Sequence, residues 1–240
     1  MPRRALYAAT TATYFSSESF TALPPGGVRV SSVTALEALE RLRAGNRRFV
    51  SGVRNGEALG NARRMELAAG QEPFAIILGC SDSRVPAEIV FDQGLGDLFV
   101  IRVAGNIVAS SLVGSVEFAA DRFGTRLVVV LGHSKCGAIL ATVEELLAQG
   151  SSGSPNLRSI VDRVRPSVEP LMATDLRHRP DELVQQAVRA NVRASANHLR
   201  HGSAILERLI QTDSLLVVGA EYSLETGEVD FFDGLPTSSS

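Results

Sequence analysis

Short apolar runs alternate with longer amphipathic segments along most of the chain. Five of the runs are predicted to be strands: 74–79, 97–103, 127–131, 215–219 and 228–232. Apolar runs without polar alternation are typical of strands that are buried on both faces. The segments between them carry apolar residues at helical spacing, and they predict helices over 34–49, 62–69, 111–123, 138–149, 157–172, 181–199 and 203–211. Strands that alternate with helices indicate an α/β fold, with a mostly parallel central sheet flanked by helices.

Glycines and polar stretches mark the connections between these elements. Gly124 is expected to close the helix over 111–123, and Gly105-Asn106 to form a turn. Thr226-Gly227 suits a tight hairpin between the last two strands. Residues 54–60 and 150–155 are predicted to be loops.

The length of 240 residues suits one domain with extensions. We predict an arm over 1–32, either flexible or wrapped around a partner, a single domain over 33–235 and a disordered tail over 236–240. The arm is rich in Arg, Ser and Thr, as an organelle transit peptide is, but it lacks a clear amphipathic basic helix. Organellar targeting is therefore the less favoured alternative to a cytoplasmic location.

Charge and cysteine content narrow the function classes. The chain has 24 Lys and Arg against 26 Asp and Glu, a formal net charge of −2, so neither nucleic acid nor an anionic membrane is an expected partner. No apolar stretch has the length needed to span a bilayer. Two cysteines leave no disulfide framework, which favours a reducing compartment such as the cytoplasm.

Both cysteines and one histidine follow predicted strands. Cys80 comes directly after strand 74–79, and His133 and Cys136 follow strand 127–131 at a spacing of three residues. Sites in such sheets form beyond the carboxyl ends of the strands. Two cysteines and a histidine match a zinc site with three protein ligands, which keeps its fourth position for water or substrate. Cysteines that merely pack and a disulfide are the alternatives, and the His-x-x-Cys spacing favours the metal.

An acid and a base follow the first cysteine. In extended backbone, residues two apart share a face, so Cys80, Asp82 and Arg84 would project together. Arginine holds a carboxylate by two parallel hydrogen bonds, which would keep the pKa of Asp82 low and leave it an acceptor for a water beside the metal. The alternative is a loop salt bridge of little energetic weight.

Two motifs resemble those of the β-class carbonic anhydrases. They are Cys80-Ser81-Asp82-Ser83-Arg84-Val85 and Gly132-His133-Ser134-Lys135-Cys136-Gly137, and the likeness extends from about Leu36 to about Phe232. The resemblance implies an α/β fold with a helical N-terminal arm, assembled as a homodimer or homotetramer with the active site near the subunit interface. It implies a zinc lyase that converts carbon dioxide reversibly to bicarbonate and a proton.

Carried over by residue, the resemblance makes Cys80, His133 and Cys136 the zinc ligands. It makes Asp82 and Arg84 the catalytic pair that orients a zinc-bound hydroxide, with Asp82 as a fourth ligand in a closed form. It also implies four residues in the substrate pocket: Gln71, Phe99, Phe118 and Gly137.

Three other functions are alternatives to this one. A zinc deaminase would carry a His-x-Glu element and a Cys-x-x-Cys pair, and this chain has neither. Hydrolysis of a related linear molecule, such as carbon disulfide, is a second enzymatic alternative that the sequence does not distinguish from this one. A metal-binding or assembly protein without turnover is the non-enzymatic alternative, and it is disfavoured because all five site residues are present. The remaining histidines, His178, His198 and His201, are expected to lie on the surface.

Overall fold

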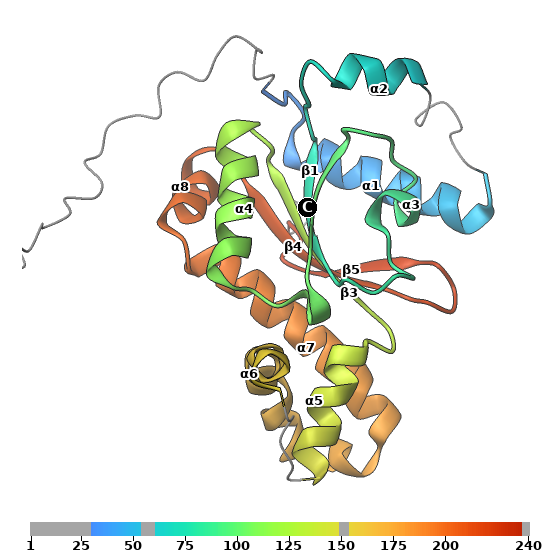
Figure 1. Cartoon of the computed structure of the whole chain (residues 1–240), viewed down its shortest axis with the longest axis vertical. Helices are drawn as coiled ribbons and strands as arrows, with labels where there is room; N and C mark the ends of the chain where they lie inside the picture. The colour runs from blue at the N-terminus through green and yellow to red at the C-terminus, as the bar shows by residue number, and fades with distance from the viewer. Residues whose placement is uncertain (1–29, 54–60, 149–153, 237–240) are drawn as a thin grey trace, which may run out of the picture.

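The computed structural model describes residues 30–53, 61–148 and 154–236, which form one five-stranded sheet with helices around it (Figure 1). The strand order is β2-β1-β3-β4-β5. Their bounds are β1 Ala75–Gly79, β2 Leu98–Arg102, β3 Leu127–His133, β4 Leu216–Tyr222 and β5 Val229–Asp233. All pairings are parallel except that of β4 with β5. The predicted α/β class with a mostly parallel sheet is confirmed.

Helices cover both faces of the sheet. The first face packs against α1 (Ala35–Ser51) and α3 (Ala87–Val90). The second packs against α4 (Ser110–Arg122), the last turns of α7 (Pro180–His201) and α8 (Ala204–Thr212). The first turns of α7 join α5 (Gly137–Ala148) and α6 (Pro155–Met172) in a helical lobe beyond the carboxyl ends of the strands (Figure 1).

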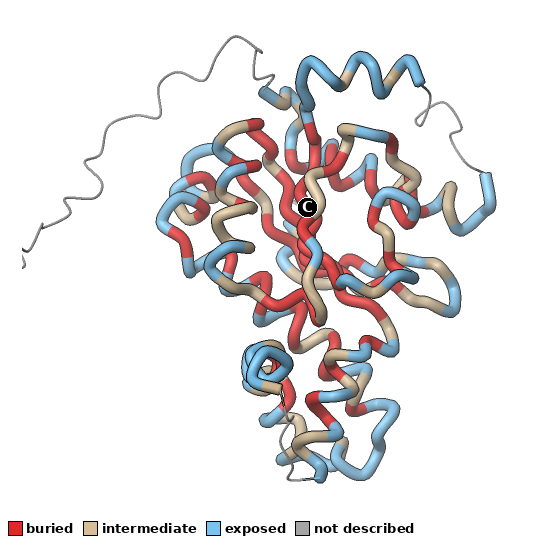
Figure 2. The backbone as a smooth tube through the Cα atoms, in the orientation of Figure 1, coloured by how far each residue is buried: buried red, intermediate tan, exposed pale blue. Residues whose placement is uncertain are grey.

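Three short helices complete the described structure. They are α2 (Asn61–Leu67), which has no buried residue, and the 3-10 turns η2 (Ala104–Asn106) and η3 (Asp175–His178). Every residue of β1 and β3 is buried, as their unbroken apolar runs predict. Figure 2 shows this burial concentrated in the central strands and on the inner sides of the helices. None of the helices in the described ranges has both the length and the apolar character needed to cross a membrane.

The predicted element boundaries differ from the structure in a few places. β3 continues to His133 and β4 to Tyr222, so both strands are longer than predicted. Residues 223–228 connect β4 to β5, so this connection is longer than the predicted tight turn, and the short helix α3 was not predicted. The loop expected over 54–60 lies outside the described residues, as does most of 150–155.

The predicted arm, 1–32, is described only from residue 30. There, the Ser31 N–H donates to the Phe123 carbonyl oxygen at 2.7 Å, which ties the chain to the end of α4. Thr34 then caps α1, accepting from the Glu37 N–H while the Glu37 carboxylate accepts from the Thr34 N–H. This reciprocal capping begins the helix predicted over 34–49.

The absence of a Cβ atom at Gly132 lets α7 lie close to the sheet. A Cβ atom at Gly132 of β3 would stand 2.5 Å from a methyl carbon of Val192 on α7, and real Cβ atoms do not approach so closely. A Cβ at Gly79 of β1 would meet its nearest neighbour at 3.8 Å, an ordinary contact. Gly79 ends β1 and Gly132 is the next-to-last residue of the adjacent β3, but the two glycines differ in the room around them.

Gly132→Ala should therefore lower the free energy of unfolding by about 1–3 kcal/mol, the usual cost of overpacking. Gly79→Ala, the matched control, should stay within about 1 kcal/mol of wild type. Urea unfolding of both variants measures the difference. Equal stabilities for the two variants would contradict the close approach of α7 to β3.

Candidate metal centre

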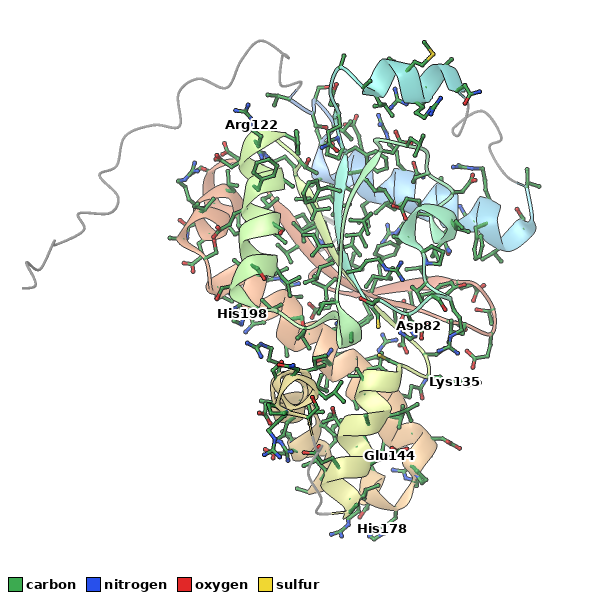
Figure 3. All side chains as sticks on the ribbon, in the orientation of Figure 1. Asp82, Arg122, Lys135, Glu144, His178 and His198 are labelled. Atoms are coloured by element: carbon green, nitrogen blue, oxygen red, sulfur yellow. The ribbon has the colours of Figure 1, made fainter. Side chains whose placement is uncertain are left out.

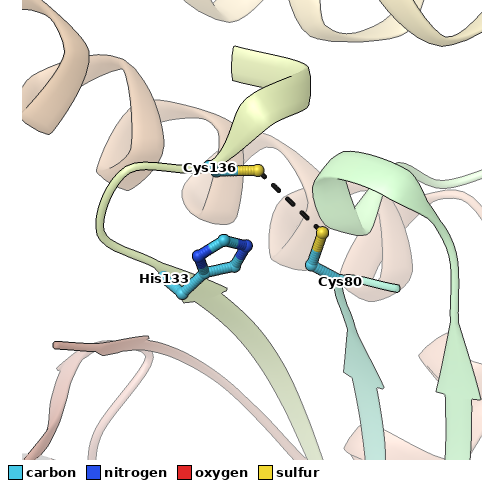
Figure 4. Close-up of side chains that lie close together, drawn as sticks. All are labelled: Cys80, His133 and Cys136. Carbon is cyan, nitrogen blue, oxygen red and sulfur yellow. Dashed lines mark hydrogen bonds between the residues drawn. The ribbon is translucent and has the colours of Figure 1, made fainter. Parts of the chain in front are cut away.

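Three potential ligands meet where β1 and β3 end (Figure 4). Cys80 follows β1, His133 is the last residue of β3, and Cys136 lies just before α5. All three are buried, and their donor atoms lie within 4.8 Å of one another. The two Sγ atoms are 4.0 Å apart and both cysteines are free thiols. Within the described residues, this is the one group of His, Cys, Asp or Glu side chains found to be arranged to hold a metal.

Main-chain contacts orient the His133 ring. Its Nδ1–H donates to the Ser134 carbonyl oxygen at 2.9 Å, which leaves Nε2 as the nitrogen with a lone pair. Nε2 is fully buried and has no hydrogen-bond partner. A buried nitrogen left without a partner is costly, and here it belongs to a group arranged like a metal site.

The two thiols affect each other's protonation. A hydrogen bond from the Cys136 thiol lowers the pKa of Cys80, to which the Gly105 N–H also donates at 3.4 Å. The same thiol pair and its burial raise the pKa of Cys136. Burial alone would lower the pKa of His133, but its contacts with Cys80 and Ser134 raise it overall. Without a metal, the site therefore retains protons that a bound cation would displace.

Asp82 and Arg84 pair beside this cluster, as predicted. Arg84 Nε donates to Asp82 Oδ1 at 2.9 Å and Arg84 Nη2 to Asp82 Oδ2 at 2.7 Å. These bonds hold the pKa of Asp82 well below its usual range. Asp82 Oδ2 lies 3.8 Å from His133 Nε2. Figure 3 places Asp82 and Lys135 at the same end of the sheet, near the start of α5.

The backbone between the pair is not extended, which corrects the reasoning that predicted their meeting. The Val85 N–H donates to the Asp82 carbonyl oxygen at 3.0 Å, and the Arg84 N–H donates to Asp82 Oδ1 at 2.9 Å. These bonds close a turn after Cys80. Asp82 and Arg84 meet because the turn folds one residue back onto the other.

Sequence reasoning missed one side chain that positions this loop. Arg102, the last residue of β2, donates through Nε to the Cys80 carbonyl oxygen at 2.9 Å and through Nη2 to the Asp82 carbonyl oxygen. The guanidinium therefore holds the backbone on both sides of Ser81. The sequence signal would have been an arginine at the end of a predicted strand, but nothing in it says which loop the side chain reaches.

The amino-acid sequence around this centre matches a known family. Residues 75–229 match the family described as carbonic anhydrase. The chain belongs to the carbonic anhydrase family. Carbonic anhydrase 2 of Mycobacterium tuberculosis is 44% identical over 190 residues, which cover 79% of this chain and 89% of that protein. A carbonic anhydrase of Mycolicibacterium smegmatis is 39% identical over 193 residues, with coverages of 80% and 91%. The chain is thus an enzyme of the carbonate dehydratase type.

Solved β-carbonic anhydrases share the fold. The enzyme CafA of Aspergillus fumigatus superposes with a TM-score of 0.65 at 28% identity, covering 72% of this chain and 82% of that chain. The β-carbonic anhydrase CcaA superposes with a TM-score of 0.63 at 26% identity, with coverages of 84% and 93%. These structures confirm the predicted resemblance to the β class.

The predicted pocket residues of this carbonic anhydrase do not lie together. Gly137 lines a cavity of about 550 Å³ between α5 and α6, directly after Cys136. Gln71 lies before the amino end of β1, in a separate cavity of about 530 Å³. Phe99, the second residue of β2, and Phe118, on α4, pack against each other and against Phe123. Only Gly137 is therefore next to the Cys-His-Cys cluster in sequence and in space.

The other histidines are exposed, as predicted. His178 ends η3, and His198 and His201 lie in the last turns of α7. Figure 3 shows His178 at the far end of the helical lobe and His198 on the side of α4. Neither is placed to exchange protons with the Asp82 carboxylate.

Metal uptake by the carbonic anhydrase should depend on pH. Because the Cys136 thiol and the His133 imidazole must lose their protons to bind a cation, affinity should fall steadily from mildly alkaline to mildly acidic buffer. The raised pKa values of Cys136 and His133 mean that protons compete already near neutrality. Calorimetric titration of the metal-free protein in buffers of different ionisation enthalpy counts the protons released. Uptake without proton release would contradict the assignment of Cys136 and His133 as ligands.

Proposed function

We propose that this carbonic anhydrase is a zinc enzyme that interconverts carbon dioxide and bicarbonate at the Cys80, His133 and Cys136 cluster. The observation that carries the proposal is the position of the Arg84-paired Asp82 carboxylate beside the unpartnered His133 Nε2. Three donors with an adjacent, fixed acceptor form a site for activating water, and a metal held by three protein ligands keeps a position for it.

The donor set fits zinc. Two thiolates bound tetrahedrally at the usual Zn–S length of about 2.3 Å would lie about 3.8 Å apart, close to the 4.0 Å between the sulfurs here. Zinc is commonly bound by thiolate and imidazole together, whereas calcium and magnesium prefer oxygen ligands. The Nδ1 contact of His133 with a carbonyl oxygen is the outer support that a ligating imidazole usually has.

The chain's own groups prepare water and substrate for reaction. Zinc, when bound, supplies the lowered pKa that makes water a nucleophile near neutral pH. Asp82 stays ionised because Arg84 holds both carboxylate oxygens, so it can only accept a hydrogen bond. It thereby fixes the direction of the reacting water's O–H and leaves an oxygen lone pair free to attack. Ile107 and Ile139 lie in the same buried cluster as Cys80 and Cys136, so the donors of the site have apolar surroundings.

Removal of the Asp82 charge tests this role. Asp82→Asn should keep zinc bound but lower kcat for carbon dioxide hydration by at least about 10²-fold, as loss of a preorganised electrostatic partner does in other enzymes. Glu88→Gln, which removes an exposed carboxylate on α3, is the matched control and should keep wild-type activity. Stopped-flow hydration with zinc analysis of each protein gives the answer. Full activity in Asp82→Asn would eliminate the proposed role, and a Cys136→Ser protein that still holds one zinc would eliminate the ligand set.

We further propose that the active site is completed by a second copy of the chain. Gln71 lies at the amino end of β1, the end opposite to Cys80, and so cannot line its own chain's metal site. Phe118 is 52% exposed although it packs on Phe99. An exposed aromatic ring on α4 that packs on edge strand β2 suits an interface. If these residues line a pocket, it is the pocket of a neighbouring copy.

Mixed dimers test this arrangement. Gln71→Ala and Cys136→Ser chains should each be impaired, but coexpressed mixed dimers should regain activity, because one of their two sites contains neither defect. Mixing chains that both carry Cys136→Ser is the control and should restore nothing. Activity of the mixed dimer no higher than that of the two parents would place Gln71 and Cys136 in the same site and contradict the proposal.

A further inference from the structure

The two residues between His133 and Cys136 are tied to a distant hairpin. Ser134 and Lys135 form the turn from β3 into α5, and Lys135 has a φ of 54°, in the left-handed region that few side chains favour. Such a conformation persists where surrounding contacts hold it. The contacts that hold this turn come from the connection between β4 and β5.

One carboxylate contacts both residues of the turn. Ser134 Oγ donates to Glu225 Oε2 at 2.8 Å, and Lys135 Nζ lies 2.6 Å from Glu225 Oε1. These bonds lower the pKa of Glu225 to about 2, so it is ionised at neutral pH. The Leu224 N–H donates to Ser134 Oγ at 3.0 Å, and the Ser134 N–H donates to the Tyr222 carbonyl oxygen at 2.9 Å. Ser134 is thus fixed through both its backbone and its side chain.

Ser134 is also the residue that orients the imidazole. Its carbonyl oxygen accepts the hydrogen bond from His133 Nδ1. A chain of contacts therefore leads from Glu225 through Ser134 to the ring of His133, and through Lys135 to the backbone of Cys136. We propose that Glu225 is a positioning residue, whose carboxylate latches the turn so that His133 and Cys136 are prearranged for the metal. This inference rests on the proposed zinc site.

The Glu225 and Lys135 side chains are exposed. This indicates that their contacts order the metal ligands more than they stabilise the fold. The Lys135 side chain is 68% exposed and that of Glu225 48%, and exposed ion pairs contribute little to folding. Partners in the outer shell of a metal site, by contrast, commonly change metal affinity by about 10- to 100-fold. The loss of Glu225 should therefore appear in the metal site before it appears in the fold.

Glu225→Gln tests the latch against a matched control. Glu228→Gln removes the same charge from the same hairpin connection, where the Glu228 carboxylate accepts a bond from Thr226 Oγ1 instead. We expect zinc to dissociate from Glu225→Gln about tenfold faster than from wild type, measured by transfer to an excess of a coloured chelator. Glu228→Gln should stay within about twofold of wild type. The cobalt-loaded variant should also show altered thiolate-to-metal absorption bands.

A purely structural role would give a different result. Urea unfolding of the metal-free proteins should be nearly the same for wild type and Glu225→Gln, and an equal loss of stability and metal retention would overturn the latch. Ser134→Ala combined with Glu225→Gln should lose zinc no faster than the faster single variant, because both act through one chain of contacts. Zinc release from Glu225→Gln at the wild-type rate would also overturn it. A wild-type protein that takes up no zinc would instead overturn the proposed zinc site. Failure of the zinc site is therefore distinguishable from failure of the role proposed for Glu225.

Discussion

The parallel pairing of β1 with β3 is the constraint on which the candidate site depends. Gly79 lies opposite Leu131 in this pairing, and the two strands run in the same direction, so both end at the same edge of the sheet. Cys80 therefore emerges beside His133. An antiparallel pairing would send the two residues to opposite edges. The apolar side chains of β1 and β3 are fully buried, so the hydrophobic effect that fixes the strands also brings the ligands together.

This arrangement carries a cost within the fold. His133 Nε2 is buried without a partner, and an unsatisfied buried polar atom costs about 1–3 kcal/mol. A cation at the three donors would remove that cost, so metal binding and conformational stability are coupled at this site. Beside the cluster, Asp82 is satisfied by Arg84 instead. The chain thus leaves a ligand nitrogen of the site without a hydrogen-bond partner, whereas the Asp82 carboxylate next to it is paired.

The chemistry could be predicted from the sequence because its residues are close together in short motifs. The Asp82–Arg84 pair and the His133-x-x-Cys136 spacing required only neighbouring residues and the position of a strand end. The backbone between Asp82 and Arg84 could not be predicted, since the turn forms only where the sheet ends. The contacts of Arg102 and Glu225 join residues that are far apart in the sequence. Strand order decides them, and the apolar pattern does not encode strand order.

Strand order also explains how the two halves of the site are supported. β2 lies beside β1, and its Arg102 holds the carbonyl oxygens around Cys80. β4 lies beside β3, and the connection that follows it brings Glu225 to Ser134. β1 and β3 each end at residues of the candidate site. The strand beside each of them, or the connection that follows that strand, supplies the side chain that holds those residues in place. The Arg102 guanidinium donates to backbone oxygens, so the Asp82 carboxylate pairs with Arg84. The Glu225 carboxylate instead acts through Ser134, whose carbonyl oxygen orients the His133 imidazole. The residues after β1 and those after β3 therefore each have their own supporting side chain. Strand order in the sheet, rather than the local motifs, determines which side chain that is.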